Sequence, residues 1–233
     1  MHSTGSLAGK TALVTDAHTG IGKAIAIALA AQGAQVVVHH PHAPEWAADV
    51  VKAITGAGGH AVALAADLGD RGEYEELVQA VLDEYGHWDV LVHTPAAAIN
   101  TALGEITDEE FELGVTAPVK GVLHGAQLAA ARMADGGRVI TVAGVDGAGN
   151  AVHDATTGAV AEFTRGLAPE FGPRRITVNA VSVGATDPNV QAADGTLGRL
   201  RDTKEITEAV ALLASADADA VTAQHIRVPN AAG

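Results

Sequence analysis

A loop with two closely spaced glycines follows the first apolar run of the chain. It reads TDAHTGIG from Thr15 to Gly22, and an alanine-rich stretch typical of a helix comes directly after it. Glycine allows a ligand to approach the backbone closely, and the N-terminus of the following helix offers free N–H groups to an anion. The alternative is a tight turn that needs Gly20 and Gly22 for packing alone. The position between a strand and a helix favours a phosphate-binding loop.

Histidines and acidic residues follow several other apolar runs, and these side chains could transfer protons. His93 follows one such run, and Asp146 and His153 follow the next. Histidine titrates near neutrality, so a histidine oriented by a carboxylate can act as a general acid or base. We therefore interpret His153, His93 and Asp146 as candidate catalytic residues. The alternative is that a chain with 11 histidines places some of them here without a catalytic role.

Three further histidines, His39, His40 and His42, lie close together after the second apolar run. Their spacing matches no compact metal-binding motif. We interpret the segment as a solvated loop and predict no metal site.

Short apolar runs and helical stretches alternate along the whole chain and would position these residues. The expected strands are residues 11–15, 36–39, 61–65, 90–93, 139–142, 177–183 and 226–228. The expected helices are residues 21–32, 44–55, 73–85, 108–133, 155–171 and 204–214. Apolar runs without polar alternation are typical of parallel strands that are covered on both faces. The pattern predicts an α/β fold with one Rossmann-type, doubly wound parallel sheet, and residues 1–233 as a single domain.

The overall composition excludes several classes of function. The chain has 233 residues with 48% hydrophobic and only 3% aromatic side chains, which indicates one aliphatic core. A formal charge of −14 disfavours nucleic acids and anionic membranes as partners. The absence of cysteine excludes disulfides and thiolate nucleophiles. With no apolar run of membrane-spanning length and no signal-peptide pattern, we expect a cytoplasmic protein that binds a small molecule.

Seven segments of the chain resemble motifs of the short-chain dehydrogenase/reductase family, in the family's order and at its spacing. They are LVTDAHTGIGKAIA (13–26), ALAADLGD (63–70), DVLVHTPAAA (89–98), GEITDEEF (104–111), GGRVITVAG (136–144), residues 159–184 and residues 205–228. The resemblance spans nearly the whole chain and implies a Rossmann-type fold. It also implies NAD(P)-dependent hydride transfer, which the site residues must be able to support.

The residues that the family uses for proton transfer are replaced in this alignment. The family uses an Asn, a Ser, a Tyr and a Lys, and Pro118, Gly144, His153 and Thr157 stand at these positions. The two tyrosines of the chain both precede the fourth expected strand, and no lysine lies between residues 121 and 203. We therefore expect a degenerate family member that has lost the hydride-transfer machinery.

The groove that holds the cofactor in the family is also altered. Asp16 replaces the first glycine of the phosphate loop, and a carboxylate ~4 Å from a pyrophosphate costs about 4 kcal/mol at an effective dielectric constant of ~20. The alternative is that Asp16 caps the next helix or turns away from the groove. Pro95 removes a backbone donor. We expect no cofactor. The vestigial groove comprises Asp16, His18, Gly20, Ile21, Gly22, His40, Asp67 and Leu68.

The end of the second expected strand indicates which cofactor would be preferred if any were bound. An NAD site places a carboxylate there for the ribose 2′-OH. This chain has His39 and His40 and no acidic residue. We therefore expect NADP(H) rather than NAD.

The resemblance further outlines a substrate pocket and suggests how the protein assembles. The pocket residues are Ala96, Ala143, Gly144, Asn150, His153, Gly184 and Asp187. The substrate lid is expected to be shortened near residues 188–197. Small-residue stretches at 126–131 and 159–168 permit close helix packing, so we expect a homo-oligomer, either a dimer or a tetramer.

Three functions are compatible with these residues. The preferred one is a repurposed non-redox enzyme that catalyses cyclisation, dehydration or isomerisation of a small, polyketide-like organic metabolite. The second is a non-catalytic ligand-binding or scaffold protein. The third is an NADPH-dependent oxidoreductase with unusual acid/base residues.

Overall fold

A seven-stranded parallel sheet forms the centre of the protein within the residues that the computed structural model describes, 5–95, 101–143, 151–183 and 203–228. The strands are β1 Thr11–Val14, β2 Gln35–His40, β3 His60–Ala65, β4 Val90–His93, β5 Arg138–Ala143, β6 Thr177–Val183 and β7 His225–Val228. Their order is β3-β2-β1-β4-β5-β6-β7, and every neighbouring pair is parallel. The predicted α/β fold with a doubly wound parallel sheet is confirmed.

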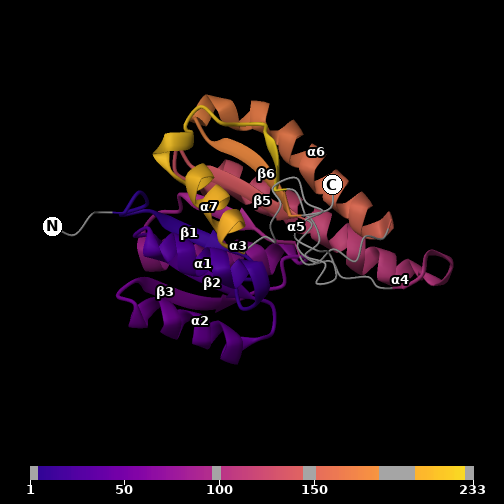
Figure 1. Ribbon diagram of the computed structural model, residues 1–233, viewed down its shortest axis with the longest axis horizontal. Helices are drawn as coiled ribbons and strands as arrows, with labels where there is room; N and C mark the ends of the chain where they lie inside the picture. Colours follow the sequence, from indigo (N-terminus) through magenta and orange to yellow (C-terminus); the bar gives the residue numbers. More distant parts are fainter. Residues whose placement is uncertain (1–4, 96–100, 144–150, 184–202, 229–233) are drawn as a thin grey trace, which may run out of the picture.

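Helices cover both faces of this sheet (Figure 1). They are α1 Gly20–Ala31, α2 Pro44–Gly56, α3 Arg71–Tyr85, α4 Asp108–Phe111, α5 Ala117–Arg132, α6 Ala151–Phe171 and α7 Thr203–Ala214. One apolar core joins α1, α2 and α7 to the sheet, and a second joins α3, α5 and α6 to its other face. Because both faces are covered, strands such as β1 and β4 are buried at every residue.

The order of the strands reverses between β1 and β4, which lie side by side in the sheet. Two hydrogen bonds connect the carboxyl ends of β1 and β4 just beyond their last paired residues. The Thr94 N–H donates to Thr15 Oγ1 over 2.9 Å, and the Thr94 hydroxyl donates to the Thr15 carbonyl. In sheets of this kind ligands bind in the crevice at such a reversal, outside the carboxyl ends of the strands.

The region expected as one long helix over residues 108–133 is interrupted. A capping box of Thr107 and Glu110 starts α4, and a π-helical turn, Glu112–Thr116, separates α4 from α5. Pro118 explains the turn, because proline lacks the N–H that would bond the carbonyl four residues earlier. That carbonyl belongs to Gly114, and it accepts a hydrogen bond of 2.8 Å from the Thr156 hydroxyl of α6.

Other expected boundaries shift by a few residues. The largest shift is in α6, which begins at Ala151 rather than at residue 155. Figure 1 shows α6 running beside α5 toward the end of the molecule that carries α4. Among the described helices, none combines the length and the apolar character that a membrane span requires.

Candidate cofactor and substrate site

A cleft of about 350 Å³ opens at the carboxyl edge of the sheet, beside the β1–β4 reversal. The ends of β1, β2, β3 and β4 and the start of α5 form its walls. Its lining residues are Asp16, His39, Pro41, Ala66, Asp67, Leu68, Gly69, His93, Pro95, Leu113, Ala117, Pro118 and Gly121. The cleft therefore contains three of the predicted groove residues, Asp16, Asp67 and Leu68, which come from the loops after β1 and β3.

The glycine loop has the geometry of an anion site. Gly20 adopts a positive φ of 53°, and a Cβ at Gly22 would lie 2.6 Å from the Asp16 carbonyl oxygen. Only glycine fits this close approach of helix to loop. Among the described residues, no side chain caps the first turn of α1 and no acidic residue lies in it. The N–H groups of that turn remain available for an anion.

Asp16 lies in the left-handed region with φ 47° and lines the cleft. Aspartate tolerates this conformation better than most residues. Thr19, not Asp16, is the N-cap residue of α1, so the alternative of a helix-capping Asp16 is wrong. Burial raises the pKa of the Asp16 carboxyl to about 6. The carboxyl is therefore neutral in part of the population near that pH, which weakens the repulsion expected from a fixed charge.

His39, near the end of β2, connects two loops and was not expected to have a structural role. Its Nδ1 accepts the Asp16 N–H over 3.0 Å, and its Nε2 lies 3.0 Å from the Ala66 carbonyl oxygen. These partners require the neutral tautomer with the proton on Nε2. Burial is the main cause that lowers the pKa of His39 to about 4. His39 thus fixes the loops after β1 and β3 against the end of β2.

His93 is 3% exposed at the end of β4. Its Nδ1 lies 3.5 Å from Thr15 Oγ1, and its ring also bonds the Pro118 backbone. Burial and the nearby His39 ring lower its pKa to about 3 despite the bond to Pro118. A neutral, enclosed ring with these partners favours a positioning role over the expected proton transfer.

His18 and His42 both lie near His40, and the three differ in exposure. His40 is 5% exposed within β2, so the expectation of a solvated loop is wrong for this residue. His40 Nδ1 accepts the Ala43 N–H over 3.1 Å, and His42 is exposed. His18 Nδ1 is buried and has no hydrogen-bond partner in the part of the chain that is described. Burial lowers the pKa of both His18 and His40, and the His18 and His42 rings lower that of His40 further. No described group of three His, Asp or Glu side chains is arranged to hold a metal ion.

The loop after β3 forms the opposite wall of the cleft. Asp67 Oδ1 accepts the Gly69 N–H over 2.8 Å, and the Asp67 N–H donates to Glu73 Oε2 over 2.7 Å. The Leu68 carbonyl lies 3.2 Å from His124 Nδ1. These bonds hold the loop in one shape, so Asp67 and Leu68 present a preformed surface to a ligand.

The predicted catalytic positions are described only in part. Pro118 lies at the start of α5, Thr157 lies in α6, and His153 lies in the first turn of α6. Ala143 ends β5. The remaining predicted residues fall outside the described residues, as does the lid near 188–197. They are Ala96, Gly144, Asp146, Asn150, Gly184 and Asp187.

Comparison with known proteins identifies the family. Residues 16–230 match the family model described as Enoyl-(Acyl carrier protein) reductase. The chain belongs to the short-chain dehydrogenase/reductase family. It is 37% identical to an uncharacterized oxidoreductase of Methylorubrum extorquens, over 97% of this chain and 98% of that protein. It is 33% identical to the hydroxynaphthalene reductase-like protein Arp2 of Metarhizium brunneum, over 95% and 94% of the two chains.

The chain is also similar to a solved structure that contains a bound cofactor and a bound ligand. The short-chain dehydrogenase/reductase fold of this chain superposes with a TM-score of 0.85 on the landomycin C-6 ketoreductase LanV, whose structure holds NADP and rabelomycin. The two are 34% identical over 97% of each chain.

These relatives correct two expectations from the sequence. The preferred function, a non-redox enzyme, is wrong, because the relatives are oxidoreductases and reductases. The expectation of no cofactor is also wrong, because a family member similar over nearly its whole length is seen with NADP. The physical error was to let the Asp16 carboxylate decide the question, because the close approach of helix to loop at Gly22 and a first turn of α1 that no described side chain caps are both retained.

Proposed function

We propose that this family member is an NADP(H)-dependent reductase of polycyclic aromatic ketones with an acid/base group other than tyrosine. The observation that carries the proposal is the glycine loop at the β1–β4 reversal. Its helix N-terminus is uncapped among the described residues, and Gly22 permits the close approach that a pyrophosphate site requires. The relatives with reductase names support the reaction type.

The residues present fit the cofactor. The N–H groups of the first turn of α1 would hold the pyrophosphate, and the preformed loop at Asp67 and Leu68 would hold the adenine. The orphaned His18 Nδ1 is a buried polar atom that lacks a partner within the described residues, as expected where a ligand completes the site. NADPH, when bound, supplies a hydride to the substrate carbonyl carbon.

The protein itself must supply a proton to the carbonyl oxygen. In the family a tyrosine of the helix after the fifth strand does this, and His153 stands at its position in the first turn of α6. Tyr74 and Tyr85 both lie on α3, and Tyr74 is buried in the core. We therefore assign proton donation to His153, since histidine can release a proton near neutral pH.

The substrate class rests on the relatives and on the lining of the cleft. One relative is named for a hydroxynaphthalene, and the LanV structure holds rabelomycin. In this chain, apolar Leu113, Ala117 and Pro118 line the cleft where α5 begins. Such a wall suits a flat aromatic ring system better than a small polar ketone.

We also propose that this protein is cytoplasmic and forms a homo-oligomer. A chain without cysteine forms no disulfide, which suits a reducing compartment, where disulfides rarely persist. Leu103 and Leu123 are exposed on the α4–α5 side of the molecule, where a second copy would cover them.

The proposal is tested by following the hydride. The protein is incubated with NADPH deuterated at the nicotinamide C4 and a panel of polycyclic aromatic ketones and hydroxynaphthalenes, with acetophenone as the small-ketone control. We expect a product that carries one deuterium, detected by mass spectrometry, from at least one polycyclic substrate. A protein that binds NADPH but transfers no deuterium to any of them would refute the reductase function.

A further inference from the structure

The start of α5 forms one wall of the cleft and is fixed to the sheet by His93. The His93 ring, at the end of β4, hydrogen-bonds the Pro118 backbone. Proline has no N–H, so the bond goes to the Pro118 carbonyl. A Cβ at Gly121 would lie 3.3 Å from His93 Cε1, so the ring also lies close to the next turn of α5. This wall of the cleft is therefore tied to β4.

The π-helical turn just before α5 is held from α6. Thr156 is 5% exposed, and its Oγ1 lies 2.8 Å from the Gly114 carbonyl of the turn and 2.9 Å from the Val152 carbonyl within α6. A hydroxyl has one proton, so the two carbonyls share it. The contact with Val152 is a local one that threonines in helices commonly make, whereas the contact with Gly114 crosses to another element. Leu113, next to Gly114, is 64% exposed and lines the cleft.

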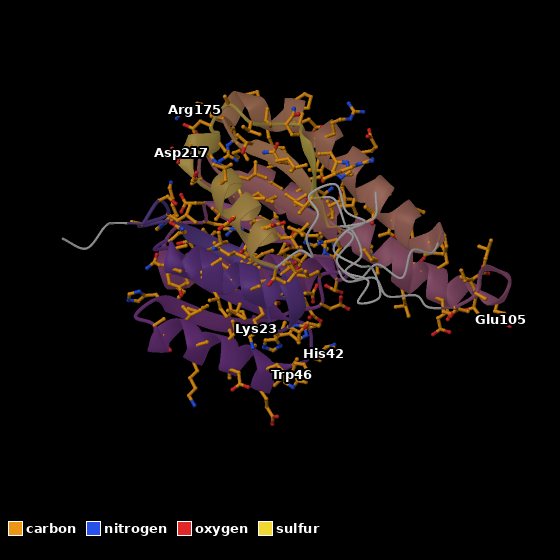
Figure 2. All side chains as sticks on the ribbon, viewed as in Figure 1. Lys23, His42, Trp46, Glu105, Arg175 and Asp217 are labelled. Atoms are coloured by element: carbon orange, nitrogen blue, oxygen red, sulfur yellow. The ribbon has the colours of Figure 1, made fainter. Side chains whose placement is uncertain are left out.

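This connection lies toward the N-terminal end of α6. Farther along the helix, Val160 of α6 and Val122 of α5 form a small buried apolar cluster. Thr156 lies about one turn closer to the start of α6 than Val160, and His153 lies in the first turn. Figure 1 shows α6 running toward the end of the molecule that carries α4, and Glu105, just before α4, marks this end in Figure 2. The hydrogen bond from Thr156 thus joins α6 to the cleft wall between the apolar cluster and the first turn.

We propose that Thr156 is a positioning residue for the reduction, whose hydroxyl holds the first turn of α6, with His153, in a fixed place relative to the wall that Leu113 lines. The inference rests on the proposed function and adds to it a residue that acts through others. A proton donor must lie within about 3 Å of the substrate oxygen, and a displacement of about 1 Å can slow a reaction by about 100-fold. Loss of the hydroxyl should therefore slow turnover and leave NADPH affinity unchanged, because the proposed pyrophosphate site lies at the start of α1.

Thr164 provides a matched control in the same helix. It is 1% exposed, and its Oγ1 lies 2.7 Å from the Val160 carbonyl and 3.2 Å from Thr141 Oγ1 of β5. Like Thr156, it combines a local contact within α6 with a contact to another element. The element reached is the cleft wall for Thr156 and the sheet for Thr164. Thr156→Val and Thr164→Val each replace the hydroxyl by a methyl group, so they remove matched pairs of hydrogen bonds.

The first experiment compares turnover and cofactor affinity in the full chain and its variants. Turnover is the transfer of deuterium from NADPH deuterated at the nicotinamide C4 to the best polycyclic ketone, and affinity is measured by calorimetry with NADPH. We expect Thr156→Val to lower kcat by roughly 10- to 100-fold while the Kd for NADPH stays within about twofold. Thr156→Ser keeps the hydroxyl and should restore kcat to within about threefold of the wild type. Thr164→Val should leave both quantities within about twofold, although it loses as many hydrogen bonds.

Hydrogen exchange tests the connection without any turnover. The Ala117 N–H donates to the Glu112 carbonyl across the π-helical turn. In Thr156→Val this amide should exchange roughly tenfold faster than in the wild type, because the turn opens more easily without its partner on α6. In Thr164→Val it should exchange at the wild-type rate. Mass spectrometry of the peptide that contains the turn gives both rates.

The outcomes distinguish this inference from the proposed function. Wild-type turnover or wild-type exchange in Thr156→Val, an equal loss of turnover in Thr164→Val, or no recovery in Thr156→Ser would overturn the positioning role and leave the reductase function standing. If the wild-type chain transfers no deuterium to any ketone, both are wrong. Melting temperatures recorded in parallel show whether each variant is folded, and Thr156→Ala replaces Thr156→Val if the valine variant is not.

Discussion

The two edges of the sheet differ in how their ionisable groups are partnered. The amino edge holds the larger cavity, about 550 Å³, and several charges there are paired: Lys10 Nζ lies 2.9 Å from Asp89, and Arg174 Nε lies 2.8 Å from Asp135. At the carboxyl edge the cleft is about 350 Å³, and burial shifts the pKa of Asp16 upward. Cavity volume alone would point to the amino edge as the ligand site. Ionisable groups with shifted pKa values, such as Asp16, instead favour the carboxyl edge.

Arg138 shows what a satisfied charge looks like at the amino edge. Only 6% exposed, it donates to the carbonyls of Gly136, Gly137 and Ser215 and pairs with Asp219. These partners leave its guanidinium without a free donor for a ligand. At the amino edge Arg138 therefore connects β5 to the segment after α7, and the proposed cofactor site lies at the carboxyl edge.

The strongest expected effect concerns the proton donor at the carboxyl edge. His153→Ala should slow NADPH-dependent reduction by roughly 100- to 10,000-fold, the usual effect of losing a general acid. Affinity for NADPH should remain within about threefold, because the residue is assigned to the substrate carbonyl. His60→Ala, at the start of β3 on the other edge, is the control for both measurements. Full turnover by a folded His153→Ala protein would remove this histidine from the mechanism.

The next largest expected effect is a loss in the free energy of unfolding, which should be greater for a substitution at the carboxyl edge than for one at the amino edge. His39→Leu leaves the Asp16 N–H and the Ala66 carbonyl without their partner, so we expect the free energy of unfolding to fall by about 2 to 4 kcal/mol. Lys10→Met should cost less than about 1 kcal/mol, because Lys10 is half-exposed and Asp89 keeps the Thr11 N–H.

Chemical denaturation measures both variants against the wild type. A loss at Lys10 as large as the loss at His39 would contradict the contrast between the edges.

The pH dependence of stability follows from the same buried groups. The unfolded state binds more protons than the native state below the ordinary histidine pKa of 6.5, because burial lowers the pKa of His39 to about 4 and of His93 to about 3. Stability should therefore fall as the pH falls from 6.5 toward 4. Asp16, with its pKa raised to about 6, acts in the opposite direction below that pH.

Two histidines outweigh one aspartate, so the net loss should be about 3 kcal/mol. Urea titrations between pH 4 and 6.5 would show it, and Asp16→Asn should steepen the loss. A stability that stays constant over this range would contradict neutral, buried histidines.

The smallest effect concerns the aspartate in the phosphate loop. Asp16→Gly and Asp16→Asn both remove the carboxylate, and both residues tolerate the left-handed conformation. Each should raise NADPH affinity by roughly 10- to 100-fold above pH 6, since each 1.4 kcal/mol is tenfold. Near pH 5 the gain should shrink, because the wild-type carboxyl is then mostly neutral. A gain with glycine only would assign the defect to backbone strain rather than to charge.

The sequence was sufficient for the fold because the relevant signals are local. Apolar runs identified all the strands of the described sheet, and β4 and β6 have the predicted bounds. The long helix over residues 108–133 was predicted too simply. The proline at position 118 that explains the π-helical turn is visible in the sequence. The Thr156 hydroxyl, which donates to the freed Gly114 carbonyl, belongs to α6, and no local signal links the two residues.

The site was predicted less completely because its properties depend on burial and on distant partners. The loops at the strand ends were correctly located, and Asp16, Asp67, Leu68 and His93 meet in one cleft. The bridging role of His39 was missed, since nothing local links it to the Ala66 carbonyl. The proline just after the π-helical turn and the histidine near the end of β2 were the available signals.

A calorimetric titration of the full chain with NADPH, and with NADH for comparison, tests the central claim most directly. The account predicts saturable binding of one NADPH per chain with a Kd of about 10 µM or tighter, and weaker binding of NADH. No saturable binding of NADPH up to about 1 mM would show that the carboxyl edge is not a cofactor site, and would contradict an NADP(H)-dependent reductase.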